Sequence, residues 1–316
     1  MHYWKGLEAV PAAVGPTVVT IGNFDGVHRG HCEVLEQVVQ RANELDAKSV
    51  AITFDPHPAL VHRPDNPPEL IMGLADRIDL LAAVGLDAVL MIHYTLEFAQ
   101  STAEEFVRQI FVEKLGAVAV VIGHDVRFGQ GNSGDFELMQ ELGKKYGFEV
   151  IGVEDVGDKR RLSSTWVREE LAAGNVEAAA KILGRPHRMR GEVVHGAARG
   201  RELGFPTANL ASDASGIIPA DGVYAGWLVD EALVRWPAAI SVGSNPTFDG
   251  VSRVVESHVI DRPTEDFGDF DLYGQQVVVE FVKHLRPMVA YRGIEALVDQ
   301  MNEDVEQTRS VLAKQV

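Results

Sequence analysis

The segment from Thr17 to His31, TVVTIGNFDGVHRGH, gives the clearest indication of how this chain folds. Its first five residues form an apolar, β-branched run, which predicts a buried strand that ends at Ile21. A glycine-rich turn follows, and a helical pattern begins close to His28. A strand, a tight turn and a helix in this order indicate an α/β domain.

The alternation of strands and helices continues to about Leu183. Strands are predicted for four further apolar runs: SVAITF from Ser49, AVLMIHY from Ala88, AVAVVIG from Ala117 and FEVIGVE from Phe148. We therefore expect a doubly wound, Rossmann-like α/β domain whose ligands lie beyond the carboxyl ends of its strands.

Two segments between these strands have clear helical patterns. In CEVLEQVVQRANELDA, one apolar face comprises Leu35, Val38, Val39, Ala42 and Leu45. In TAEEFVRQIFVEKLG, Thr102 and Glu105 form a capping-box pattern, which predicts the first turn of another helix.

Beyond Gly184 the pattern changes to short, β-branched segments separated by Gly, Pro and Asp turns. These segments are RGEVVH, GVYAGWLVD, AAISVG, RVVESHVID and QQVVVEFVKHL. A closing helix is predicted from the helical spacing of Ile294, Leu297, Val298, Met301, Val305 and Leu312. We expect an antiparallel β-barrel with this helix on its outside, and we divide the chain into domains at 1–183 and 184–316.

Composition narrows the classes of protein to consider. The length of 316 residues suits two domains, and the formal net charge of −17 disfavours binding to nucleic acid or to an anionic membrane. No apolar run is long enough to predict a transmembrane helix.

Cys32 is the single cysteine, so an internal disulfide is excluded and a cytoplasmic location is expected. The oligomeric state stays open, and a homo-oligomer is compatible with the sequence.

The turn GNFDGVHRGH contains a candidate phosphate site. His28 and His31 are three residues apart, so at a helix start they share one face, beside backbone N–H groups that suit a phosphate. Two imidazoles at this place would stabilise the charge that builds up on a phosphate during attack. The alternative is a tight strand-to-helix turn with surface histidines.

The same string resembles the HxGH signature of the nucleotidylyltransferase superfamily, and specifically its FAD synthetase branch. The supporting strings TFDPHP, GHDVRFGQG and RLSSTWVRE follow in the expected order. The resemblance implies adenylyl transfer to FMN, with His28 and His31 donating hydrogen bonds to the ATP phosphates. It places ATP against Gly22, Phe24, Asp25, Gly30, Asp125, Arg161, Ser164 and Thr165. For Asp55 and His57, a link to a metal and a structural role are both left open.

Gly129, Gly131 and Gly134 fit the G-x-G-x-x-G pattern of a dinucleotide site. The first glycine is separated from the strand end at Gly123 by HDVRF, whereas the fingerprint turn follows its strand directly. We therefore interpret this segment as a loop over a ligand and not as an NAD site.

The second half has no P-loop motif, but it contains HGAARGRELGFPTANL from His195 to Leu210. Arg199 and Arg201 in this glycine-framed segment suit a phosphate. Thr207 and Asn209 offer neutral oxygens of the kind that Mg²⁺ accepts when ATP supplies the charge. A surface loop with an Asn turn is the alternative.

The string GFPTAN resembles the signature of riboflavin kinases, and DGVYAGW, ISVGSNPTF, VESHVID and DLYGQ agree with that family. The resemblance implies that Gly204, Pro206, Thr207 and Asn209 bind ATP, with Mg²⁺ at Thr207 and Asn209. It makes Glu256 the general base for the riboflavin 5′-hydroxyl.

Strand alternation supports this role for Glu256, since it places Val254, Glu256, His258 and Ile260 on one face. If Val254 and Ile260 point inward, the Glu256 carboxylate is buried beside them. Burial of a charge is costly, so this carboxylate needs either an ion-pair partner or a role in catalysis. The alternative to a base is a structural ion pair of Glu256 with Arg253 or His258.

Together the two resemblances cover roughly residues 17–312 and imply a bifunctional enzyme of the prokaryotic FAD synthetase family. Riboflavin and ATP would give FMN and ADP, and FMN and ATP would then give FAD and pyrophosphate, both with Mg²⁺. The expected partners are these small molecules. Two rival hypotheses are an adenylyltransferase for another small phosphate with an accessory β-domain, and a non-catalytic flavin-binding sensor.

Overall fold

The computed structural model describes residues 1–157, 160–196, 203–247, 250–261, 271–290 and 293–314. Contacts divide the chain into two compact units. Unit 1 is Met1–Glu69 with Leu74–Ser163, and unit 2 is Leu70–Gly73 with Ser164–Val316. The helical segment before residue 184 therefore belongs to unit 2 by its contacts, while the functional boundary at 183/184 stays a prediction.

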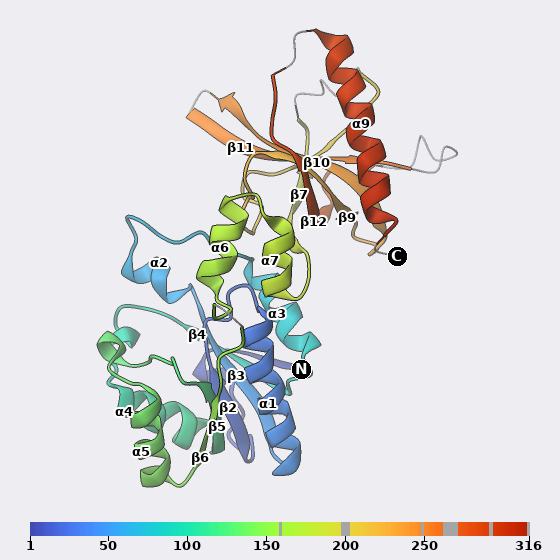
Figure 1. Cartoon of the computed structure of the whole chain (residues 1–316). Helices are drawn as coiled ribbons and strands as arrows, with labels where there is room; N and C mark the ends of the chain where they lie inside the picture. The colour runs from blue at the N-terminus through green and yellow to red at the C-terminus, as the bar shows by residue number, and fades with distance from the viewer. Residues whose placement is uncertain (158–159, 197–202, 248–249, 262–270, 291–292, 315–316) are drawn as a thin grey trace. The chain divides into compact units, whose positions relative to one another are not determined.

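Unit 1 is built on a six-stranded parallel sheet in the order β1-β4-β3-β2-β5-β6 (Figure 1). Its strands are β1 His2–Lys5, β2 Thr17–Ile21, β3 Lys48–Asp55, β4 Ala88–His93, β5 Ala117–Gly123 and β6 Glu149–Val153. The five strands predicted from apolar runs are β2 to β6, so that prediction is confirmed. β1 was not predicted, and it extends the sheet by pairing with β4.

Both faces of this sheet are covered, as its continuous apolar strands require. The helices are α1 Arg29–Glu44, α2 Pro58–His62, α3 Leu74–Ala83, α4 Ala103–Phe106 with its π-helical continuation η3 Val107–Lys114, and α5 Phe136–Tyr146. The predicted capping box of Thr102 and Glu105 begins α4. α1 packs on β2, β3 and β5 and buries Leu35, Val38 and Ala42. Leu45 follows the end of α1 and is exposed, which corrects its place on the apolar face.

The strand order positions the first site. From β2 the chain continues to β3 on one side, whereas β5 lies on the other side of β2 and leads to β6. The connections that leave the carboxyl ends of β2 and β5 therefore diverge, which opens a ligand crevice in doubly wound sheets. The turn Gly22–His28 follows β2, and Asp125 follows β5.

Unit 2 contains a closed barrel in the order β10-β11-β8-β7-β12-β9 (Figure 1). Its strands are β7 His187–Val194, β8 Ala208–Leu210, β9 Gly222–Val229, β10 Arg235–Thr247, β11 Gly250–Val259 and β12 Gln276–Arg286. All of the barrel pairs are antiparallel, as predicted. The sequence pattern missed only β8, a strand of three residues.

Three helices accompany the barrel in the described part of unit 2: α6 Ser164–Ala172, α7 Val176–Leu183 and α9 Ile294–Leu312. α9 is the predicted closing helix, and it contacts β9, β10 and β12. Its buried residues, Asp304, Val305, Thr308 and Leu312, lie in its second half. Ile294 is 66% exposed, so its expected place on the packed face was wrong.

Candidate active sites

The turn between β2 and α1 has an unusual backbone. Phe24 and Val27 have φ angles of 50° and 36°, and Gly26 has a φ of 87°. Non-glycine residues in this region carry strain and gather at functional sites. At Gly22 a Cβ would lie 2.9 Å from the Phe24 ring, so only glycine fits there.

The two histidines of this turn lie together, as their spacing predicted. His28 is the N-cap of α1, and its Nδ1 accepts a hydrogen bond of 3.2 Å from the His31 N–H. The two rings stack with centroids 3.6 Å apart. Because Nδ1 accepts, a neutral His28 carries its proton on Nε2, which makes Nε2 the hydrogen-bond donor of this ring.

Arg77 on α3 supports this turn and was missed in the sequence. It is 5% exposed, and its Nη1 donates to the carbonyl of Asn23 at 2.9 Å; Thr53 Oγ1 donates to the same carbonyl at 3.1 Å. Burial lowers the pKa of Arg77, while the charges of Asp25 and Asp55 raise it. An isolated arginine in a helical pattern carries no sequence signal for such a role, because its partners lie elsewhere in the chain.

Asp125 and Arg161, both expected to contact ATP, form an ion pair with each other. Arg161 also lies 3.5 Å from Asp155, and the hydrogen bond that Arg161 donates to Asp125 raises the pKa of Arg161. Asp125 follows β5 and Asp155 follows β6, so parallel strand ends bring these groups to one edge of the sheet. Ser164 and Thr165 begin α6, which is part of unit 2.

His57 has a structural contact. Its Nδ1 accepts a 3.1 Å hydrogen bond from the N–H of Ala59 and thereby caps α2. Within the residues that the structure describes, no group of three or more His, Cys, Asp or Glu side chains is placed to hold a metal ion. This contact gives His57 a structural role as the N-cap of α2, while a link of Asp55 or His57 to a metal stays an open alternative.

In unit 2, the barrel brings Thr207, Asn209 and Glu256 together. Asn209 on β8 is the register partner of Glu256 on β11. Thr207 Oγ1 donates to Glu256 Oε2 at 3.3 Å and accepts from Asn209 Nδ2 at 3.2 Å. A Cβ at Gly196 would lie 2.5 Å from the Asn209 amide, so glycine allows the chain after β7 to approach this group closely.

Glu256 lies on the face of β11 opposite to the one expected, and Arg253 has another partner. The barrel core is formed by the other face of β11, where Val255, Ser257 and Val259 are buried, so Glu256 is half-buried on the opposite face. Arg253, named with His258 as an alternative ion-pair partner of Glu256, instead pairs with Asp221 at 2.7 Å.

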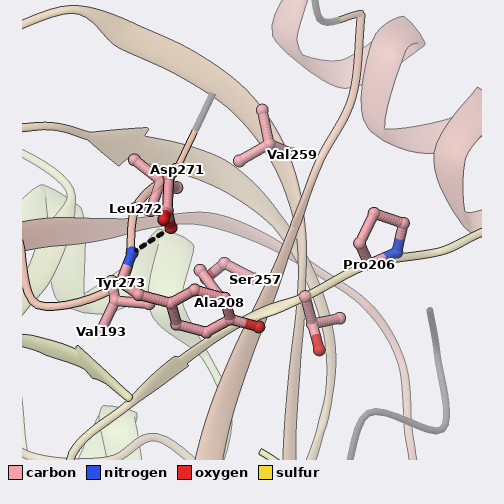
Figure 2. A pocket seen from close by; sticks show the side chains of 9 residues that line it. Val193, Pro206, Ala208, Ser257, Val259, Asp271, Leu272 and Tyr273 are labelled. Carbon is pink, nitrogen blue, oxygen red and sulfur yellow. Dashed lines mark hydrogen bonds between the residues drawn. The ribbon is translucent and has the colours of Figure 1, made fainter. Parts of the chain in front are cut away.

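A cavity of about 90 Å³ lies beside Thr207 (Figure 2). Its lining comes from β7, β8, β11 and the segment 271–273: Val193, Pro206, Thr207, Ala208, Ser257, Val259, Asp271, Leu272 and Tyr273. The Tyr273 ring lies 3.8 Å from that of His195, centroid to centroid. The string DLYGQ was noted in the sequence, but the part of Tyr273 in the cavity wall was not.

The remaining sequence expectations for this region are outside the site or outside the described residues. Gly204 has a φ of 86° and precedes the loop of Pro206. Arg199 and Arg201 lie outside the described residues.

Comparisons with known proteins agree on both halves of the chain. Residues 11–166 match the family model for FAD synthetase, and residues 183–312 match the model for riboflavin kinase. Among the residues that the structure covers, no helix has the length and apolar character needed to cross a bilayer.

Full-length relatives show the same combination. The bifunctional riboflavin kinase/FMN adenylyltransferase of Pseudomonas fluorescens is 37% identical over 99% of this chain and 98% of its own length. The Escherichia coli K12 protein of the same name is 34% identical over 91% of this chain and 90% of its own. A Streptococcus pneumoniae crystal structure, described as a macrolide-efflux protein, has a TM-score of 0.88 at 32% identity and covers 98% of this chain and 99% of that one. The chain belongs to the family of bifunctional riboflavin kinase/FMN adenylyltransferases.

Proposed function

We propose that the two reactions of this bifunctional enzyme use separate side-chain clusters: Thr207, Asn209 and Glu256 for riboflavin phosphorylation, and His28 and His31 for FMN adenylylation. The observation that carries the proposal is the meeting of Thr207 with Glu256. These residues are 49 apart in the sequence, yet their side chains are joined at 3.3 Å. A carboxylate beside a hydroxyl and an amide supplies both a base and neutral ligands for a nucleotide.

In the kinase reaction, Glu256 accepts the proton of the riboflavin 5′-hydroxyl. The oxygen then bonds to the γ-phosphorus of ATP, the bond from this phosphorus to the β-phosphate oxygen breaks, and ADP leaves. Thr207 and Asn209 orient the triphosphate, while Gly204 and Pro206 shape the loop that carries Thr207. In phosphoryl transfer, positioning and charge stabilisation account for most of the catalysis.

The donor set around Glu256 fits Mg²⁺ that arrives with ATP. Thr207 Oγ1 and Asn209 Oδ1 are neutral oxygens, the ligand type that this ion accepts. Asn209 directs its Nδ2 toward Thr207, which leaves Oδ1 as the acceptor of its amide. When bound, the ion would neutralise charge on the triphosphate.

In the adenylyl transfer, a phosphate oxygen of FMN bonds to the α-phosphorus of a second ATP and pyrophosphate leaves. The Nε2–H of His28 donates to a phosphate oxygen, and His31 acts from the same face of α1. The strained turn from Gly22 through Phe24 and Asp25 to Gly30 lines the approach to the helix start. Asp125 and Arg161 of unit 1 are further nucleotide contacts in this proposal, and Ser164 and Thr165 stay candidates on the resemblance alone.

Two variants of the full chain test the division of labour. Glu256→Gln keeps the shape and hydrogen-bond acceptor but takes no proton, so FMN formation should fall by about 10²–10⁴-fold. His28→Asn keeps an N-cap acceptor for α1 but removes the Nε2–H, so FAD formation from FMN should fall while kinase activity stays. Both activities are measured for each variant with Mg-ATP.

Other outcomes identify the rivals. Loss of both activities in a folded Glu256→Gln variant would contradict separate sites. Wild-type protein that adenylylates without forming FMN would favour an accessory β-domain, and absence of any turnover would favour a sensor. A cytoplasmic location is part of the proposal, since the sequence has a single cysteine, Cys32, and therefore forms no internal disulfide.

A further inference from the structure

The β8–β11 ladder ends next to the kinase site. These strands pair at Asn209 with Glu256 and at Ala208 with Ser257. Pro206 has no backbone N–H and therefore donates no ladder hydrogen bond. Thr207 lies directly before β8, where the backbone ladder gives way to side-chain contacts.

His258 supplies such a contact at this point. Its Nδ1 lies 2.9 Å from the carbonyl oxygen of Pro206. Because a carbonyl only accepts, Nδ1 is the protonated nitrogen and donates the hydrogen bond. A side chain of β11 thereby adds a hydrogen bond to the residue that precedes Thr207.

Glu256 and His258 share one face of β11, because strand side chains alternate. They hold consecutive residues of the loop: His258 holds Pro206 through its carbonyl, and Glu256 holds Thr207 through its hydroxyl. The contact of His258 is thus made to the residue directly before the one that Glu256 contacts.

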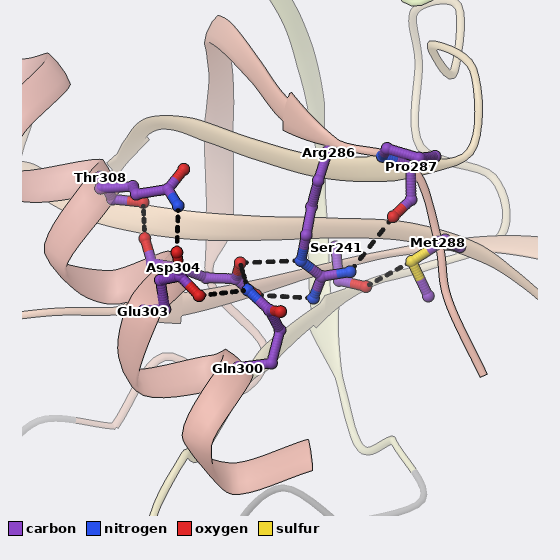
Figure 3. Close-up of polar contacts among 9 residues, drawn as sticks. Ser241, Arg286, Pro287, Met288, Gln300, Glu303, Asp304 and Thr308 are labelled. Carbon is purple, nitrogen blue, oxygen red and sulfur yellow. Dashed lines mark hydrogen bonds and ion pairs between the residues drawn. The ribbon is translucent and has the colours of Figure 1, made fainter. Parts of the chain in front are cut away.

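The loop is held from its other side by Phe205. The Phe205 ring meets the His258 ring edge-on, with centroids 5.2 Å apart, and it packs with Ile260 and with Val305 of α9. α9 is attached to the barrel at the residue before Val305, because Asp304 accepts two hydrogen bonds from Arg286 (Figure 3). His258 therefore joins the loop to a fixed platform.

We propose that His258 is a positioning residue for riboflavin phosphorylation: through the Pro206 carbonyl and the Phe205 ring, it holds Thr207 within reach of Glu256. This inference rests on the proposed kinase roles of Thr207 and Glu256.

The test compares His258→Ala, which removes the hydrogen bond and the ring contact, with His258→Phe, which keeps only the ring. We expect His258→Ala to lower kcat/KM for riboflavin phosphorylation about tenfold, with a raised KM for Mg-ATP, because both contacts are lost. His258→Phe should recover part of this loss. Val254→Ala is the matched control, since Val254 lies on the same face two residues before Glu256, and its kcat/KM should stay within about twofold of wild type.

Adenylylation of FMN by the same preparations is the internal control, because a general loss of folded protein lowers both activities and leaves KM unchanged. Wild-type kinase parameters in His258→Ala would overturn the inference, as would a His258→Phe variant no better than His258→Ala or a parallel fall of both activities. The Glu256→Gln variant distinguishes a failure of the proposed kinase site from a failure of the positioning role of His258. If that variant keeps kinase activity the proposed site fails, whereas if only His258→Ala is unaffected the positioning role alone fails.

Discussion

Among single residues, Tyr224 shows how burial fixes a protonation state. Its side chain is fully buried beside Phe281 and His284, and its hydroxyl donates to the carbonyl of Ala220 at 2.5 Å. Burial raises the pKa of Tyr224 to about 12. A ring enclosed in this way has no free face for a ligand.

The raised pKa predicts a loss of stability at high pH. Tyrosine in the unfolded chain ionises near pH 10, whereas folded Tyr224 stays neutral up to about pH 12, so the unfolded state alone loses the proton between these values. This residue's contribution is complete below pH 10 and should decline by about 2–3 kcal/mol as the pH reaches 12.

Urea unfolding of wild type and Tyr224→Phe at pH 9 and pH 12 checks this, because phenylalanine has no proton to lose. The free energy of unfolding should fall further for wild type than for the variant. Equal falls in both proteins would mean that Tyr224 ionises as readily in the fold as outside it.

The residues of the two sites were predictable to different degrees. Helical spacing predicted that His28 and His31 lie on the same face of the helix start. Glu256 was predicted from a strand pattern together with the resemblance to riboflavin kinases. The argument from burial for Glu256 was nevertheless wrong about the face, because both faces of β11 carry apolar residues. Arg77 had no local signal at all, since its partner Asn23 is 54 residues away.

At the scale of elements, a buried ion pair helps to attach α9 to the barrel. Arg286 at the end of β12 gives two hydrogen bonds to Asp304, and Gln300 adds a third (Figure 3). The side chains of Arg286 and Asp304 are 18% and 6% exposed. A pair this well buried leaves a costly unpaired charge when one member is removed.

We therefore expect Asp304→Ala to lower the free energy of unfolding of unit 2 by about 3–5 kcal/mol. Glu303→Ala is the control, because Glu303 is the exposed neighbour on the same helix and its loss should cost less than about 0.5 kcal/mol. Urea unfolding followed by circular dichroism measures both. Similar midpoints for the two variants would show that the ion pair does not secure α9.

Element prediction succeeded where a pattern is long enough to be periodic. The strands β2 to β6 are unbroken apolar runs, and β9 to β12 are β-branched segments between turns. β1 and β8 have four and three residues, too few for a pattern, and Pro206 closely precedes β8. These two strands exist because β4 and the pair of β7 and β11 offer them partners, which is information held in the tertiary structure.

At the scale of the whole molecule, each proposed catalytic cluster is assembled within one unit. His28 and His31 come from unit 1, and Thr207, Asn209 and Glu256 come from unit 2. Neither cluster borrows a catalytic side chain from the other unit. A chain that has lost one activity should therefore keep the other in full.

This independence can be tested by mixing two variants, each of which is impaired in a different one of the two reactions. We expect Glu256→Gln to form FMN about 10²–10⁴-fold more slowly but still to adenylylate it, and His28→Asn to form FMN but to adenylylate it slowly. An equimolar mixture given riboflavin and Mg-ATP should therefore form FAD faster than either variant alone. Since FMN has to leave one chain and reach another, FAD should appear after a lag during which FMN accumulates, and the lag should shorten as the enzyme concentration rises. The double variant, at the same total concentration, should form FAD no faster than either single variant. If each single variant keeps its own activity and the mixture is still no faster than either variant alone, FMN does not pass through solution, and the two clusters act only within one chain.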